Sequence, residues 1–505
     1  MKMIKKYKIN LVVLMVLSLI VTSCADLEVE NENDPDFERA ISSPDDLVTL
    51  IEGSMVNLLW STMTFQVVNY DLQADIITST NAASNYWGDA DEPRRQVNNL
   101  TTFDDKSNNE FTWNGGYVAN TAANNLIKFV EVNGNDLILS DGTDATAKTL
   151  AAAYMMKGIG IGYVGYIYDK GYIVDVDTDI NAVEYSTYAE LIQASIGYFE
   201  KAKAIYAANP DVVFDYITDS SLSAAEAIQL ANSYAARFLI GQARTNAEAE
   251  TLDYNSIKTY ASGGLEADWS PTSDGTIIYN GQHSWNTFTI DDDGAAYLPV
   301  DLQIPYLFST EGDGPEYAKT YPSSGLLEEA VTDDARIDTD FFYTQSLGWL
   351  REDRNRSIFS NYTYYRYEYN YASSNSGSPM HIITASEMDM IEAEAEVRLG
   401  NYAAAKTIID NGARTVRGGL APLADANQET LEHAVWYENI IELHSSGCGI
   451  ALAYMRRWDR MQEGSYLHLP VPGFELEIAN ETNYTYGGAG NGAQEGTASG
   501  SNAWK

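Results

Sequence analysis

The chain has 505 residues, with 72 acidic and 31 basic side chains and a formal net charge of −41 at pH 7. Such an acidic surface repels phosphate backbones and anionic membrane surfaces, so nucleic acid is excluded as an expected partner. With 45% hydrophobic residues and only two cysteines, the fold must be stabilised by a large apolar core and not by disulfides.

The first residues have the pattern of a bacterial lipoprotein signal peptide. Lysines between Lys2 and Lys8 precede an apolar run that is too short to span a bilayer, because spanning needs about 20 apolar residues. Small residues before Cys24 match a lipobox, in which the cysteine is lipidated and becomes the mature N-terminus. We therefore predict a signal peptide over 1–23, a lipid on Cys24 and an acidic tether over 24–40. The alternative is an ordinary signal peptide with an incidental cysteine.

Helical patterns dominate the chain after residue 41. Ser43-Pro44-Asp45 is typical of a helix start, and Thr384 with Glu387 fits a capping box. The Gly-Asn-Tyr turn at Gly400 joins two Ala-rich helical segments and resembles a tetratricopeptide hairpin, which stacks into a superhelix. Further helices are expected near 117–131, 147–169, 187–207, 223–245, 385–399, 401–413 and 429–444.

A glycine-rich stretch contains Gly-x-Gly-x-x-Gly at Gly160, Gly162 and Gly165. A dinucleotide-binding fold needs a strand before the first glycine, but residues 147–157 are strong helix formers and the helical period continues through the glycines. Each glycine inside a helix costs about 0.8–1 kcal/mol relative to alanine. We therefore expect this stripe to pack closely against neighbouring helices, and we do not expect a nucleotide site.

Between residues 268 and 384, Gly, Ser, Asp and Pro become frequent and no long helix is visible. Alternating tyrosines from Tyr365 to Tyr371 predict a strand whose rings pack on helices. We predict one mainly α domain over 41–505, an α-superhelix of tetratricopeptide-like helical hairpins with a large loop-rich insertion containing short strands. In this division the helical scaffold covers 41–267 and 385–460, the insertion covers 268–384, and an irregular tail covers 461–505.

Several segments, in chain order, resemble the SusD/RagB family of nutrient-binding outer-membrane lipoproteins. They are the lipobox with its tether, Ser386–Asn401 with the following Val416-Arg417, Tyr437–Leu443 with Arg456–Arg460, and Leu469–Pro472. The resemblance implies a superhelix packed against a more irregular ligand-binding region, anchored on the surface of a Bacteroidetes-type outer membrane. It further implies a non-enzymatic lid on a TonB-dependent, SusC-like transporter, which captures oligosaccharides or, in another branch of the family, peptides.

A sugar offers an apolar ring face and a fringe of hydroxyls, so aromatic rings beside amide, carboxylate or guanidinium groups suit it. One loop after the first helices has this chemistry, where the family commonly places a ligand-contacting loop. The candidate residues are Asn85, Tyr86, Trp87, Asp89 and Arg94 in this loop, with Trp285 and Trp349 in the insertion. For each tryptophan, the alternative is an anchor in the core.

Sequence patterns for catalysis or metal binding are weak. Paired carboxylates would suit a surface glycoside hydrolase, but among 72 acids a pair such as Asp333 and Asp334 arises by chance. The five histidines lack metal-ligand spacing, and Asp291–Asp293 lacks the rest of an EF-hand loop. Cys448 and Trp458 are expected to be buried structural residues. We expect no catalytic residue, metal or cofactor; a surface enzyme and a scaffold that only binds partner proteins remain the alternatives to nutrient binding.

Overall fold

A computed structural model describes most of the chain after residue 42. The described residues are 43–64, 67–79, 82–217, 220–272, 297–320, 327–345, 360–366 and 379–505. The predicted signal peptide, Cys24 and the tether lie outside the described residues, as do Trp285, Trp349 and the Asp291–Asp293 turn. Every helix among the described residues falls short of the length and apolar content that crossing a membrane requires.

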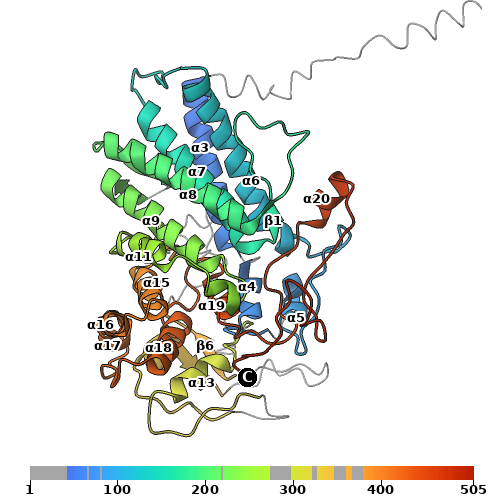
Figure 1. The fold of residues 1–505 in the computed structure, drawn as a ribbon, viewed down its shortest axis with the longest axis vertical. Coiled ribbons are helices and arrows are strands. Elements are labelled where there is room, and N and C mark those ends of the chain that lie inside the picture. The colour runs from blue at the N-terminus through green and yellow to red at the C-terminus, as the bar shows by residue number, and fades with distance from the viewer. Residues whose placement is uncertain are drawn as a thin grey trace, which may run out of the picture.

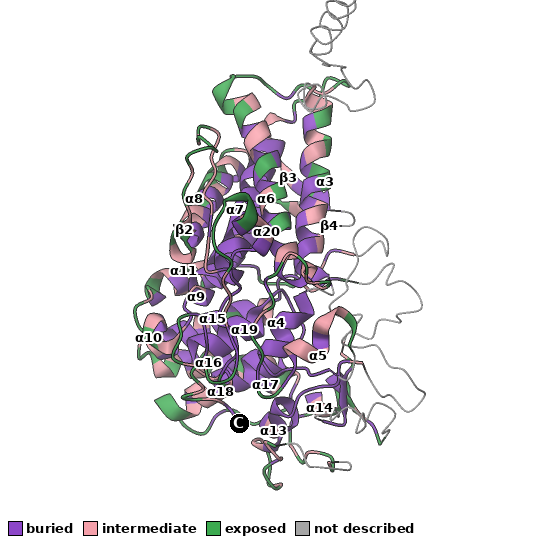
Figure 2. Cartoon of the chain, turned by 90° about the vertical axis from the view of Figure 1, so that its right-hand side faces the viewer, coloured by how far each residue is buried: buried purple, intermediate pink, exposed green. Residues whose placement is uncertain are grey.

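The body of the protein is a stack of helices in which each long helix packs on the next one in the chain (Figure 1). In order they are α3 (Pro44–Met63), α6 (Ser107–Ile127), α7 (Thr146–Ile167), α8 (Tyr188–Ala208), α9 (Ala224–Gly241), α11 (Tyr254–Ser262), α15 (Ala385–Arg398), α16 (Tyr402–Asn411) and α18 (Gln428–Ile441). Figure 2 shows that the central helices are largely buried, whereas exposed residues gather at the outer turns. The predicted mainly α superhelix is confirmed.

Shorter elements connect this stack. They are α4 (Val68–Gln73), η3 (Ala83–Asn85), α5 (Tyr86–Asp89), the π-helical turn η4 (Lys128–Val132), α10 (Asn246–Ala249), α13 (Gln303–Ser309), α14 (Arg336–Asp340), α17 (Ala413–Val416), α19 (Ile450–Arg457) and α20 (Gly473–Ile478). Three antiparallel hairpins pair β1 (Lys170–Gly171) with β2 (Ser186–Thr187), β3 (Val213–Ile217) with β4 (Ser220–Ser223), and β5 (Phe341–Tyr343) with β6 (Tyr362–Tyr364). Helix α20 therefore lies inside the segment that was predicted as an irregular tail.

Side-chain caps fix where several helices begin. The Ser43 hydroxyl accepts a hydrogen bond from the Asp46 amide at 3.1 Å, with Pro44 in the first turn, as the sequence predicts. Ser223 forms a full capping box at the start of α9. At α15 only half of the predicted box forms. Thr384 caps the Glu387 amide at 3.2 Å, but the Glu387 carboxylate turns away to an arginine on α9.

The glycine stripe lies inside the continuous helix α7, which is buried from Thr149 to Ile167. A Cβ atom added at Gly158 would lie 2.6 Å from the Phe199 ring on α8, and one at Gly162 would overlap the Phe238 ring on α9. On the opposite side, a Cβ at Gly160 would lie 2.8 Å from a backbone oxygen of α6. The glycines therefore allow three neighbouring helices to approach α7, and the expectation of helix packing instead of a strand-fed nucleotide loop is confirmed.

The insertion leaves and re-enters the helical stack at one place. The Trp269 amide donates to the Ile383 carbonyl at 2.8 Å, and α11 before the insertion packs on α15 after it. Within the insertion, β6 is the described start of the tyrosine strand. Tyr362 and Tyr364 on this strand are buried in the core, whereas Tyr365, the first of the alternating tyrosines, is 45% exposed. The alternating residues beyond Arg366 lie outside the described residues.

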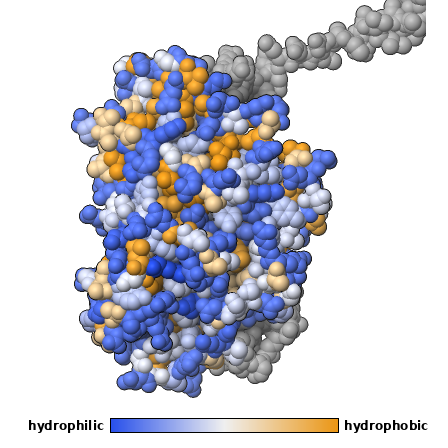
Figure 3. Space-filling view, in the orientation of Figure 1, coloured by the Kyte–Doolittle hydropathy of each residue, from blue (hydrophilic) through white to orange (hydrophobic). Residues whose placement is uncertain are grey.

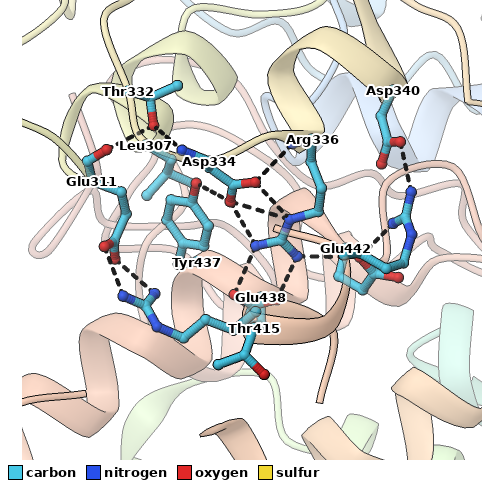
Figure 4. Close-up of polar contacts among 12 residues, drawn as sticks. Leu307, Glu311, Thr332, Asp334, Arg336, Asp340, Thr415, Tyr437, Glu438 and Glu442 are labelled. Atoms are coloured by element: carbon cyan, nitrogen blue, oxygen red, sulfur yellow. Dashed lines mark hydrogen bonds and ion pairs between the residues drawn. The ribbon is translucent and has the colours of Figure 1, made fainter. Parts of the chain in front are cut away.

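A buried ionic network fixes the insertion to the helices (Figure 4). The Arg336 guanidinium, fully buried on α14, pairs with Asp334 at 2.7 Å, Glu438 at 2.6 Å and Glu442 at 3.1 Å. Tyr437 on the same face of α18 donates to Asp334 at 2.7 Å. Removing one partner from a buried ion pair leaves an uncompensated charge, so this network locks the insertion to α18. The network also explains why the Tyr437–Leu443 segment contains two acids, because Glu438 and Glu442 both pair with Arg336.

Two buried arginines near the end of α19 join it to other helices. Arg456 on α19 donates to the Tyr166 carbonyl at 2.8 Å and the Gly241 carbonyl at 2.6 Å, at the last turns of α7 and α9. Cations favour helix C-termini because the terminal carbonyls lack partners within the helix. Next to Arg456 in the sequence, Arg457 pairs with Glu394 at 2.6 Å, and buried Trp458 donates to the same carboxylate at 2.9 Å. The prediction that Trp458 is structural is confirmed, and Cys448 is buried as expected.

Candidate functional site

The predicted ligand loop folds as the short helices η3 and α5 over α4. Its residues do not all face outward. The Tyr86 side chain is fully buried, 0% exposed, in a small apolar cluster with Val68, Leu72 and Leu298. This corrects the prediction that Tyr86 contacts ligand: the ring anchors the loop to α4, as expected of an aromatic side chain with apolar neighbours on all sides.

Arg94 is also a structural residue and not a free ligand contact. It is 4% exposed, pairs with Asp75 and donates to the backbone oxygens of Asp89 at 3.0 Å and Leu72 at 3.3 Å. Burial alone would lower the pKa of Arg94, but the carboxylates around it, with Asp75 first, raise the pKa above its usual value. Arg94 therefore ties the end of the loop to the residues after α4.

The outer part of the loop holds Asn85, Trp87 and Asp89, which are all partly exposed. Asn85 has a left-handed backbone with φ of 58°, and its Nδ2 donates to Asp89 Oδ1 at 3.1 Å. The Asn85 side chain lies directly over Gly88, where any Cβ would overlap it. A left-handed backbone is tolerated best by asparagine among non-glycine residues, so sequence and contacts together hold this turn in one shape.

Asp89 lies at the boundary between the loop and a small polar cavity. Burial raises the pKa of Asp89 to about 7, although nearby Arg94 and the hydrogen bond from Asn85 act in the opposite direction. The cavity lies beneath the loop, next to the start of α6. Its walls are Asn69, Asn85, Asp89, Val97, Asn98, Phe103, Asn108, Asn109, Tyr466 and Leu469.

A larger groove runs between α3 and α6, beside the start of α20. Its volume is about 340 Å³, and it is lined by Leu50, Ser54, Trp113, Asn114, Tyr117, Val118, Thr121, Ala122, Asn125 and Glu475. Trp113 Nε1 donates to Glu475 Oε1 at 3.3 Å, and burial raises the pKa of the Glu475 carboxyl. Figure 3 shows that hydrophobic residues gather over the upper half of this face, where the first helices lie. The helix expected near 117–131 includes Tyr117, but sequence reasoning identified neither Trp113 as a site residue nor this concave surface.

One cluster of acids has the spacing of a metal site. Single carboxylate oxygens of Asp75, Glu92 and Asp301 lie within 4.8 Å of one another. Positive charge is already supplied there, because Arg94 pairs with Asp75 and the Lys505 ammonium contacts both Glu92 and, at 3.7 Å, Asp301. The cluster therefore acts as an ionic clasp that includes Lys505.

Of the predicted site residues, the structure brings Asn85, Trp87 and Asp89 together at the surface and places Tyr86 and Arg94 below them. Trp285 and Trp349 cannot be placed relative to this loop, since they lie outside the described residues.

No family model matches the sequence, and no curated protein does. Solved structures do match. A SusD superfamily protein from Parabacteroides distasonis matches with a TM-score of 0.59 at 13% identity, over 87% of this chain and 98% of that one. A SusD homolog from Bacteroides uniformis matches with a TM-score of 0.57 at 13% identity, over 85% and 94%.

The chain has the SusD fold. A SusD-like carbohydrate binding protein from Bacteroides vulgatus is a further neighbour, with a TM-score of 0.55 at 15% identity over 82% of this chain and 83% of that one. The fold of most of the chain therefore supports the resemblance that the short motifs indicate, although few residues are identical.

Proposed function

We propose that this protein is a cell-surface lipoprotein that binds an oligosaccharide and delivers it to a TonB-dependent, SusC-like transporter in the outer membrane. The observation that carries the proposal is the partly exposed Trp87, which lies between Asn85 and Asp89 in the turn that their hydrogen bond closes, on a chain with the SusD fold. The lipobox at Cys24 and the acidic segment after it support a lipid anchor followed by a tether.

Each part of the turn has a chemical role in this proposal. The Trp87 ring supplies an apolar face for the C–H side of a sugar ring, and the Asn85 amide supplies a donor and an acceptor for hydroxyls. Tyr86 beneath them is immobile in the core, and Gly88 leaves room for the Asn85 side chain. Because the turn is already ordered, little conformational entropy is lost when a ligand binds.

Calorimetric titration of the chain with a panel of oligosaccharides tests the proposal. We expect Trp87→Ala to weaken binding of the preferred glycan about 30-fold, since a central aromatic contact contributes on the order of 2 kcal/mol. The matched control is Trp60→Ala, which removes a partly exposed tryptophan on α3. Its ring packs edge-on against Phe111, with the two ring centroids 4.8 Å apart. Equal loss in both variants, or release of reducing ends from a polysaccharide by the purified protein, would contradict the proposal.

The groove between α3 and α6 favours peptide binding as a second candidate function. Leu50, Val118 and Ala122 supply apolar wall, and the half-buried Glu475 carboxylate would accept a basic side chain whose stem lies along that wall. In that case peptides containing lysine or arginine should bind, Glu475→Gln should weaken them, and Trp87→Ala should leave their affinity unchanged.

A further inference from the structure

The small cavity below the Asn85–Asp89 turn is unusual because its polar walls consist almost wholly of hydrogen-bond acceptors and amides. Asn69 reaches it from α4, Asp89 from α5, Asn108 from the start of α6, and Tyr466 from the segment after α19. The cavity has room for a single water-sized particle. It is assembled from four segments, three of them within residues 69–109 and the fourth after α19.

Three oxygen atoms of this wall lack a hydrogen-bond partner within the described part of the chain: Asn69 Oδ1, Asp89 Oδ2 and Asn108 Oδ1. Asn69 and Asn108 are each only 5% exposed. The orientation of Asn108 is fixed, because its Nδ2 donates to the Ser84 carbonyl at 2.6 Å and leaves the oxygen for the cavity. Buried polar atoms in folded proteins almost always have a partner, so this arrangement requires an occupant.

The number and kind of these atoms decide between a water molecule and a cation. When Asp89 is ionised, a water molecule, which has two O–H donors, would leave one of the three acceptors unsatisfied. A cation satisfies all three. Carboxylate and amide oxygens are ligands for hard cations, and Ca²⁺ accepts irregular oxygen coordination, whereas Mg²⁺ demands near-ideal octahedral geometry.

We propose that this cavity is a Ca²⁺ site, with Asn69 Oδ1, Asp89 Oδ2 and Asn108 Oδ1 as side-chain ligands. The other asparagines that line the cavity are the source of further oxygen ligands. With a single carboxylate the site belongs to the weak class of Ca²⁺ sites, with a Kd of about 0.1–1 mM. Spacing in the sequence cannot reveal such a site, because Asn69, Asp89 and Asn108 lie on three separate elements.

The charges around the cavity are compatible with a cation. Arg94 approaches the backbone oxygen of Asp89 at 3.0 Å, but its guanidinium is neutralised by Asp75. Asp105 is the acidic neighbour, and its charge adds to the negative potential at Asp89. Without a cation, burial favours the protonated form of Asp89, and a bound Ca²⁺ would reverse that preference.

The test is calorimetric titration of the whole chain, stripped with a chelator, with CaCl₂ alone. We expect one Ca²⁺ per chain and a rise in Tm on adding Ca²⁺. The isosteric Asp89→Asn should weaken Ca²⁺ binding at least about tenfold, because affinity follows the number of charged ligands. Asp104→Asn, which removes an exposed carboxylate outside the cavity wall, is the matched control and should bind like the parent.

The proposal is overturned by any of three results. These are no saturable binding up to about 10 mM Ca²⁺, equal affinity in the parent chain and in the Asp89→Asn variant, or equal affinity for Mg²⁺. The titration contains no glycan or peptide. Its failure would therefore leave the proposed nutrient binding untouched, and failure of glycan binding would leave the Ca²⁺ site standing.

Discussion

Replacing Gly162 with alanine tests the packing of the superhelix most sharply. In an open helix this change would stabilise the fold by about 0.8–1 kcal/mol, because alanine is the better helix former. At Gly162 the new methyl group would overlap the Phe238 ring and lie 2.7 Å from Ser195 Oγ. Both neighbours are buried, and the Ser195 hydroxyl already donates to the Gly158 carbonyl at 2.6 Å.

Overpacking of a close-packed core costs about 1–3 kcal/mol, and a rigid buried ring is a neighbour that cannot move aside cheaply. Subtracting the gain in helix propensity, we expect Gly162→Ala to destabilise the protein by up to about 2 kcal/mol. Guanidinium denaturation, followed by circular dichroism at fixed protein concentration, measures the difference from the parent chain.

The same substitution at Gly197 is the matched control. Gly197 lies on the exposed face of α8, with no atom within 4 Å of a Cβ placed there. Gly197→Ala should therefore stabilise the protein by up to about 1 kcal/mol. Opposite signs at the two positions are the expected result. If both variants were stabilised equally, the close approach of α9 to α7 would be refuted.

Three further predictions concern buried ionisable side chains. Arg336→Met should destabilise the protein by about 3–5 kcal/mol, because buried Asp334 and Glu438 lose their arginine partner, whereas Glu442 keeps Arg366 and Arg417. Arg95→Met, which removes an exposed guanidinium, should change stability by less than about 1 kcal/mol in the same denaturation assay. Because folding raises the pKa of Asp89 from 3.8 to about 7, the folded state binds the proton more tightly, so the stability that Asp89 contributes is lost as pH rises through this window. In chelator, Asp89→Asn should therefore gain stability relative to the parent chain between about pH 4 and 7 and no more above it, and a difference independent of pH would be contrary evidence. In a Cys24→Ser chain, Cys448 should resist a disulfide reagent until the protein unfolds, because burial raises its thiol pKa; rapid reaction in native buffer would show that the thiol is exposed.

Local signals in the sequence were sufficient for much of the helical stack. Ser43-Pro44-Asp45 marks the start of α3, and the glycine stripe in α7 correctly indicates close packing. Helix α6 begins ten residues before the predicted position at 117. The prediction missed these residues because they include Asn and Gly, which are poor helix formers. There Gly115 packs against Ser61, so tertiary contact outweighs propensity.

The site was less accessible to sequence reasoning. Tyr86 and Trp87 are adjacent aromatic residues in one loop, and nothing in their spacing distinguishes the buried ring from the partly exposed one. The apolar partners of Tyr86, such as Leu298, lie far away in the chain. The cavity and the α3–α6 groove likewise arise only when distant segments meet, as when Glu475 reaches Trp113.

A crystal structure of the complex with the tightest-binding glycan is the most direct test of the function proposed for this fold. We predict a sugar ring stacked on Trp87, within about 4 Å of the indole, with hydroxyls on the Asn85 side chain. A glycan bound in the α3–α6 groove beside Trp113, with Trp87 making no contact, would contradict the account.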